Sequence, residues 1–188
     1  MYHELSHASH YSQVSWGWYS TFVAAELHEI IANPSGQFNP YGTGTTSYSP
    51  IIALGEGWAY HIGHFLADQR YGTISSCQAE QTDAFGFGIF FCPNGTNHPN
   101  IDVLENFDPN LLTDPFRWIP KGLLEDMTDN TNEINPITDN VQGFTIQQLY
   151  LALQADVNSV EQYRTRFIQQ NPGNQNQQTI NLFGQYHY

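Results

Sequence analysis

Residues 3–7 read HELSH, and this stretch decides how the rest of the chain is interpreted. His3 and His7 stand four positions apart, and Glu4 directly follows the first of them. On an α-helix, residues i and i+4 lie on one face about one turn apart, so both imidazoles can point at one ion. Zinc accepts such nitrogen ligands in tetrahedral geometry. The pattern therefore predicts two metal ligands and, in Glu4, a carboxylate that can take a proton from water.

A catalytic zinc site usually has three protein ligands and one open position, so a third ligand has to be found. His10 is nearest, but it lies about 10.5 Å along the helix axis from His3. The alternative for His10 is a polar residue near the cleft or a hydrogen-bond partner of a metal ligand. Glu56, in IIALGEGWAYHIGH, is the stronger candidate, because a carboxylate in an apolar stretch costs free energy unless it is paired or binds a metal. An exposed glutamate near a helix N-terminus is the alternative reading of Glu56.

The stretch around Glu56 has the pattern of a helix that begins near Ser49 and ends near Tyr71. Its apolar residues at helical spacing are expected to form one buried face, and these are Ile52, Trp58, Ile62, Phe65 and Leu66. Gly55 and Gly57 flank Glu56 and leave room for a second helix to approach. The sequence therefore predicts that two helices bring the metal ligands together.

HELSH followed by GEGWA resembles the gluzincin group of zincin metallopeptidases, and HELSHASHY … GEGWAY is similar to secreted or lipoprotein-type bacterial metallopeptidases. The resemblance covers about the first 70 residues. It implies Zn²⁺ as the cofactor, held by His3, His7 and Glu56, with Glu4 as the catalytic base. The implied reaction is hydrolysis of a peptide bond in a protein or peptide substrate.

Two roles of the gluzincin pattern stay open. Some gluzincins place an acidic residue four after the ligating glutamate, where this sequence has Tyr60. Glu26 and Glu29 are the candidates for a carboxylate that orients a metal-bound imidazole, with an exposed helix face as the alternative for at least one. The donor to the developing oxyanion is expected to be Tyr60 or His64 rather than His61, which points about 100° further round the helix than Tyr60.

The resemblance also implies a β-sheet lobe ahead of the first helix, whereas this sequence starts at that helix. The expected fold is mainly α: a zincin-like catalytic subdomain, residues 1–188 forming a single domain, with the upstream β-sheet lobe absent. A missing N-terminal lobe of the same protein is then an expected partner, and the zinc site is expected to be incomplete. A reduced, self-sufficient domain is the alternative.

The composition bears on partners and on location. Five Lys plus Arg stand against 18 Asp plus Glu, for a formal net charge of −13, which disfavours binding to nucleic acid and to anionic membrane surfaces. No run of 18 apolar residues is present, so no membrane insertion is expected. Cys77 and Cys92 are expected to form a disulfide. These features suit a secreted, periplasmic or cell-surface bacterial protein, with a lipid anchor on a missing N-terminus as a variant.

The C-terminal part is expected to be structural. Thr145 and Ser159 resemble N-caps of two helices within a helical part at about residues 144–171. Residues 172–188 read as a polar tail, ordered at its end only if Leu182 and Phe183 dock.

Two rivals to the hydrolase remain. One is a non-catalytic surface-binding module on a zincin scaffold, although a purely structural metal would not need Glu4. The other is a helical interaction domain whose histidines have this spacing by chance.

Overall fold

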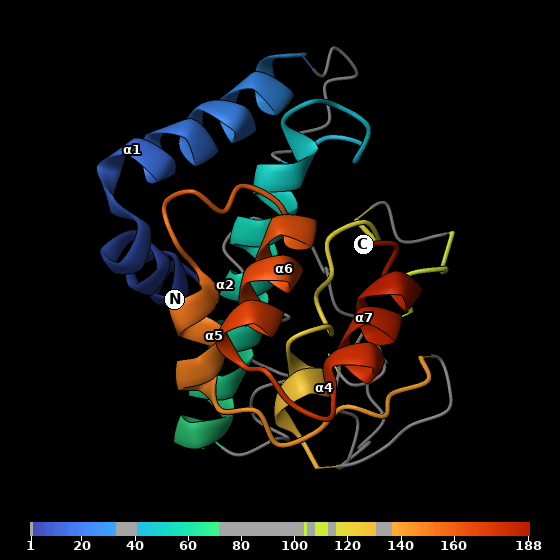
Figure 1. The fold of residues 1–188 in the computed structure, drawn as a ribbon. Coiled ribbons are helices and arrows are strands. Elements are labelled where there is room, and N and C mark those ends of the chain that lie inside the picture. Colours follow the sequence, from blue (N-terminus) through green and yellow to red (C-terminus); the bar gives the residue numbers. More distant parts are fainter. Residues whose placement is uncertain (1, 33–40, 72–103, 105–107, 113–115, 131–136) are drawn as a thin grey trace.

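The structure, a computed structural model, describes residues 2–32, 41–71, 104, 108–112, 116–130 and 137–188. Within these ranges the chain is mainly helical and has no strand, which confirms the mainly α expectation. The helices are α1 (Tyr2–Ala32), α2 (Ser49–Tyr71), α4 (Glu125–Thr128), α5 (Ile146–Ala152), α6 (Val160–Gln170) and α7 (Asn176–Gln185) (Figure 1). The expected disulfide between Cys77 and Cys92 lies outside the described residues.

Helix α1 is bent sharply in its middle, as the blue ribbon in Figure 1 shows. The bend is at Ser15, whose backbone has φ 80° and ψ 173°. This region suits glycine, and it costs another residue about 1–3 kcal/mol, which surrounding contacts must offset. One such contact follows the bend directly, because Trp18 Nε1 donates a hydrogen bond of 2.7 Å to the carbonyl of Val157.

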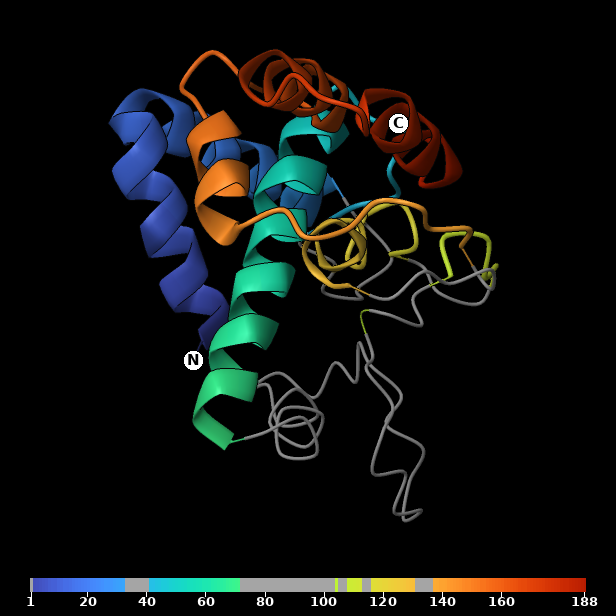
Figure 2. The same cartoon turned by 60° about the horizontal axis from the view of Figure 1, so that its bottom comes forward.

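Both halves of α1 approach α2 closely, and glycines of α2 make this possible. A Cβ atom on Gly55 would lie 2.5 Å from the ring of Phe22, in the second half of α1. A Cβ atom on Gly63 would lie 3.1 Å from the backbone of His3, in the first half. The space that we expected from the sequence at Gly55 is therefore occupied by a second helix, α1. The space at Gly57 faces Pro120 instead. Figure 2 shows α2 between α1 on one side and α4 on the other.

The observed bounds of α2 confirm the expected helix. Ile52, Trp58 and Ile62 are buried as expected. The expectation was wrong for Phe65, which is 37% exposed, and Leu66 is only half-buried. The reason is that the C-terminal turns of α2 extend past the start of α1 (Figure 2).

The two predicted N-caps of the C-terminal part are present. Thr145 and Gln148 form a reciprocal capping box at the start of α5, and the Ser159 side chain accepts a hydrogen bond from the backbone of Gln162 at the start of α6. Residues 172–188 are more than a tail, because they contain α7, whose Leu182 and Phe183 are fully buried.

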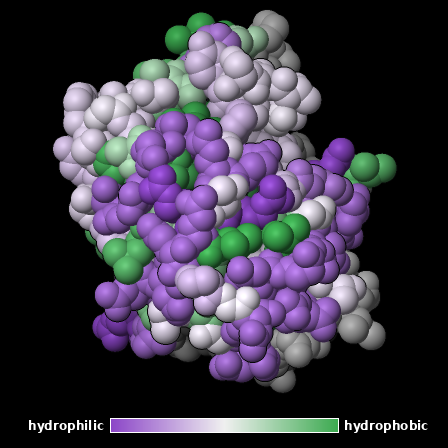
Figure 3. Space-filling model, in the orientation of Figure 1, coloured by the Kyte–Doolittle hydropathy of each residue, from purple (hydrophilic) through white to green (hydrophobic). Residues whose placement is uncertain are grey.

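One hydrophobic core joins the N-terminal and C-terminal helices. Its members include Val14, Trp18, Phe22, Ile52, Trp58, Leu149, Val160, Tyr163, Phe167 and Phe183. The outer face over α6 and α7 is largely hydrophilic, with small apolar patches (Figure 3). None of the described helices combines the length and apolar character needed to span a bilayer.

Candidate metal centre

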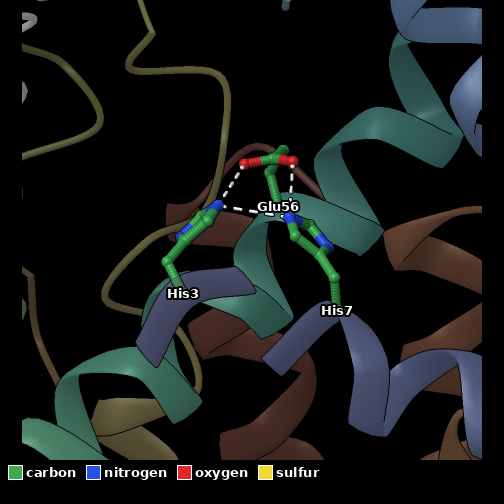
Figure 4. A group of neighbouring side chains, drawn as sticks. All are labelled: His3, His7 and Glu56. Carbon is green, nitrogen blue, oxygen red and sulfur yellow. Dashed lines mark hydrogen bonds and ion pairs between the residues drawn. The ribbon is translucent and has the colours of Figure 1, made fainter. Parts of the chain in front are cut away.

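Three side chains predicted as metal ligands converge where α1 meets α2 (Figure 4). His3 Nε2 lies 3.2 Å from Glu56 Oε2, and His7 Nε2 lies 3.2 Å from Glu56 Oε1. The two imidazole Nε2 atoms are themselves 3.2 Å apart. One ligand atom from each residue lies within 4.8 Å of the others, so a single ion can contact all three.

Glu56 is only 1% exposed, and its charge needs compensation. Its described ion pairs are with imidazoles alone. Burial by itself would raise the pKa of Glu56, but His7 and His3 outweigh it and hold that pKa well below the usual range. The carboxylate in turn raises the pKa of His7 against the opposite effect of burial.

The two imidazoles and the carboxylate suit a bound metal ion better than they suit a state in which both imidazoles are protonated. Two protonated imidazoles with ring nitrogens 3.2 Å apart would repel each other. An ion between them uses both nitrogen lone pairs and neutralises the buried carboxylate. Two imidazoles and one carboxylate are ligands that suit zinc, with a position left open.

The second half of α1 adds another carboxyl group to the centre. Glu26 hydrogen-bonds Glu56, and its pKa is raised to about 10 by burial, by the charge of Glu56 and that hydrogen bond, and by Glu4. Glu26 is therefore protonated at neutral pH and donates to Glu56. Glu4 is exposed, and its charge acts on both His7 and Glu26, so its carboxylate borders the site on the solvent side.

Neither candidate for orienting a metal-bound imidazole does so. His7 Nδ1 is buried, and the described part of the chain offers it no hydrogen-bond partner. Glu26 faces Glu56, while Glu29 accepts a hydrogen bond of 2.5 Å from the hydroxyl of Thr46. Glu29 thereby holds the loop before α2.

Two tyrosines border the centre, one predicted and one missed. The ring centroid of Tyr60 lies 4.9 Å from that of His3, which places this predicted residue beside the ligands. Tyr41 lies close to Tyr60 and Glu56, and burial followed by the charge of Glu56 raises its pKa. Tyr41 lies in the loop before α2, where no ligand spacing signals a role.

The two other histidines considered from sequence lie apart from the converging group. His10 is 1% exposed, and its ring centroid lies 4.2 Å from that of Trp18. Neither of its ring nitrogens has a hydrogen-bond partner within the described ranges. His64 is buried in α2, and its charge contributes to lowering the pKa of Glu125. Its predicted role as an oxyanion donor gains no support from this placement.

Comparisons with family models, with characterised proteins and with solved structures found no match to this chain. The centre is therefore interpreted from its own chemistry. Its parts are two imidazoles and a buried carboxylate that converge, an exposed glutamate next to a ligand, and two tyrosine side chains.

Proposed function

We propose that the chain binds Zn²⁺ through His3, His7 and Glu56 and hydrolyses peptide bonds, with Glu4 as the general base. The observation that carries this proposal is the convergence of the ligand atoms from two helices, with contacts of 3.2 Å. The spacing H-E-x-x-H alone would supply two ligands. The buried carboxylate on α2 supplies the third, as the resemblance to gluzincins implies.

The roles of the side chains follow from their positions. Zinc, when bound, supplies a Lewis acid that acidifies water and polarises a carbonyl group. Glu4 takes up the proton of the attacking water and passes it to the leaving amine, and its exposure gives it access to both. Tyr41 and Tyr60 offer hydroxyl groups to the oxygen that becomes negative in the transition state.

Substrate and location belong to the same proposal. A protein or peptide substrate and a site of action outside the cytoplasm are supported by the resemblance and by the acidic composition.

The test combines metal analysis with a matched pair of variants. Purified protein is expected to hold Zn²⁺ and to cleave members of a peptide library. Glu4→Gln should keep the metal and lose roughly 10²-fold or more in rate. Glu161→Gln, a control in an exposed carboxylate on α6, should change neither.

Each result that differs from these expectations has a distinct meaning for the proposal. Equal activity of Glu4→Gln and wild type would refute the role of Glu4 as base. Zinc binding without cleavage, in wild-type protein that includes any N-terminal lobe, would favour the non-catalytic binding module. Wild-type protein with no affinity for zinc would overturn the proposal as a whole.

A further inference from the structure

A second pair of histidines lies on a different side of α2 from the metal centre. On an α-helix His61 lies roughly 140° and His64 roughly 80° round the axis from Glu56. Whereas Gly63 meets α1, this side of α2 packs towards α4 and the residues before it, as the contact of Gly57 with Pro120 shows. His61 is 1% exposed and His64 is 2% exposed.

The ring of His61 is held in one orientation by Glu125. His61 Nδ1 lies 3.0 Å from Glu125 Oε2. Burial would raise the pKa of Glu125, but the hydrogen bond and charge of His61 and the charge of His64 outweigh it and lower that pKa. Glu125 is therefore an ionised acceptor, so Nδ1 of His61 carries the proton and donates.

When His61 is neutral, its proton is on Nδ1, bonded to Glu125, and the lone pair of Nε2 lies inside the protein. The atom is buried and has no hydrogen-bond partner among the residues that the structure describes. Buried polar atoms are nearly always satisfied, so an orphaned one calls for an explanation. Histidines that bind a metal through one ring nitrogen usually donate the other N–H to an acceptor such as a carboxylate, and Nδ1 of His61 has such an acceptor in Glu125.

His64 supplies a second nitrogen ligand within reach. Residues i and i+3 are neighbours on a helix surface, so His61 and His64 lie one turn apart on the same face. Because the charge of His64 acts on Glu125, the imidazole of His64 lies on the side of α2 where His61 is held.

We infer that His61 and His64 form a second site for a divalent transition ion of the zinc type, with Nε2 of His61 as a ligand and Glu125 as the group that orients its ring. Water completes the coordination, because the pair supplies only two protein ligands. The site does not depend on the proposed hydrolase, since it shares no ligand with His3, His7 or Glu56.

Wild-type protein provides the first test, by NMR of ¹⁵N-labelled imidazoles during titration with Zn²⁺. The ¹⁵N chemical shifts of the His3 and His7 ring nitrogens are expected to change as one equivalent of zinc binds. Those of Nε2 of His61 and of a ring nitrogen of His64 are expected to change as the other equivalent binds. An unchanged Nε2 of His61 in excess zinc would overturn the second site.

Metal counting on variants provides the second test. Wild type should bind two Zn²⁺ per chain, and His61→Ala one. His3→Ala should also bind one, at the second site. A failure of the proposed centre at His3, His7 and Glu56 can therefore be distinguished from a failure of the second site. Glu125→Gln should weaken the second site roughly 10–100-fold. His28→Ala, a control in an exposed histidine, should keep both ions. A second ion that persists in His61→Ala would refute the assignment, and the NMR titration decides the matter if that variant does not fold.

Discussion

A Cβ atom on Gly63 would lie 3.1 Å from the Cα atom of His3, so α2 touches the backbone of α1 at the first of the three proposed metal ligands. Gly63→Ala should push the start of α1 away from Glu56 by a few tenths of an ångström. We expect zinc affinity to fall about tenfold, or ~1.4 kcal/mol, measured by competition with a chelating dye. Gly173→Ala is the control, because a Cβ there meets nothing within 4 Å. Equal affinities of the two variants would show that this contact does not position the ligand.

Glu26 should matter to the metal centre as a neutral donor rather than as a charge. Its pKa of about 10 keeps it protonated at neutral pH, hydrogen-bonded to Glu56. Glu26→Gln preserves a donor and should leave zinc affinity nearly unchanged. Glu26→Leu removes the donor and should weaken zinc binding roughly tenfold, at the low end of the effect of groups that orient metal ligands. If the Gln variant loses as much affinity as the Leu variant, the ionised form of Glu26 is the one that matters.

His10 should make the zinc-free protein sensitive to acid. Burial, followed by the charge of His7, lowers the pKa of His10 from 6.5 to about 3. As pH falls below 6.5, the unfolded chain binds the proton first, so the folded state loses up to roughly 1.4 kcal/mol per pH unit until about pH 3. His10→Phe keeps an aromatic ring beside Trp18 and should flatten this dependence.

The measurement is urea unfolding at several pH values in the presence of a chelator. His28→Phe, in an exposed histidine, is the control and should keep the wild-type slope. A wild-type slope in His10→Phe would mean that other groups account for the acid sensitivity.

Docking of α7 should contribute substantially to stability. Phe183 is fully buried, and its ring centroid lies 6.3 Å from that of Tyr163 in α6. Phe183→Ala should cost about 3–5 kcal/mol in the free energy of unfolding. Ile180→Ala, at a position 40% exposed on the same helix, should cost far less. Urea unfolding followed by circular dichroism compares them, and equal costs would show that the end of the chain is not part of the core.

The parts of this structure that local sequence rules govern could be predicted. The caps at Thr145 and Ser159 follow from hydrogen bonds within one turn, and the pairing of His3 with His7 follows from helix geometry. Their meeting with Glu56 was also predictable, because few other arrangements compensate a carboxylate in so apolar a helix.

The parts that depend on tertiary packing could not be predicted. The bend in α1 occurs at Ser15 although Gly17 is close by, since contacts such as that of Trp18 with Val157 fix where the chain turns. That bend decides which second-half side chains reach the centre, so the pairing of Glu26 with Glu56 had no local signal. Tyr41 reaches it from a loop whose path no periodicity describes.

The helices that hold the three converging ligands, α1 and α2, follow each other directly along the chain. Contacts between successive elements require only a short loop closure, which costs little entropy and favours rapid formation. This pair can therefore associate during folding before α5, α6 and α7 have docked. If the three side chains bind zinc as proposed, a nascent helical hairpin already holds all three ligands, and zinc then takes part in the folding pathway.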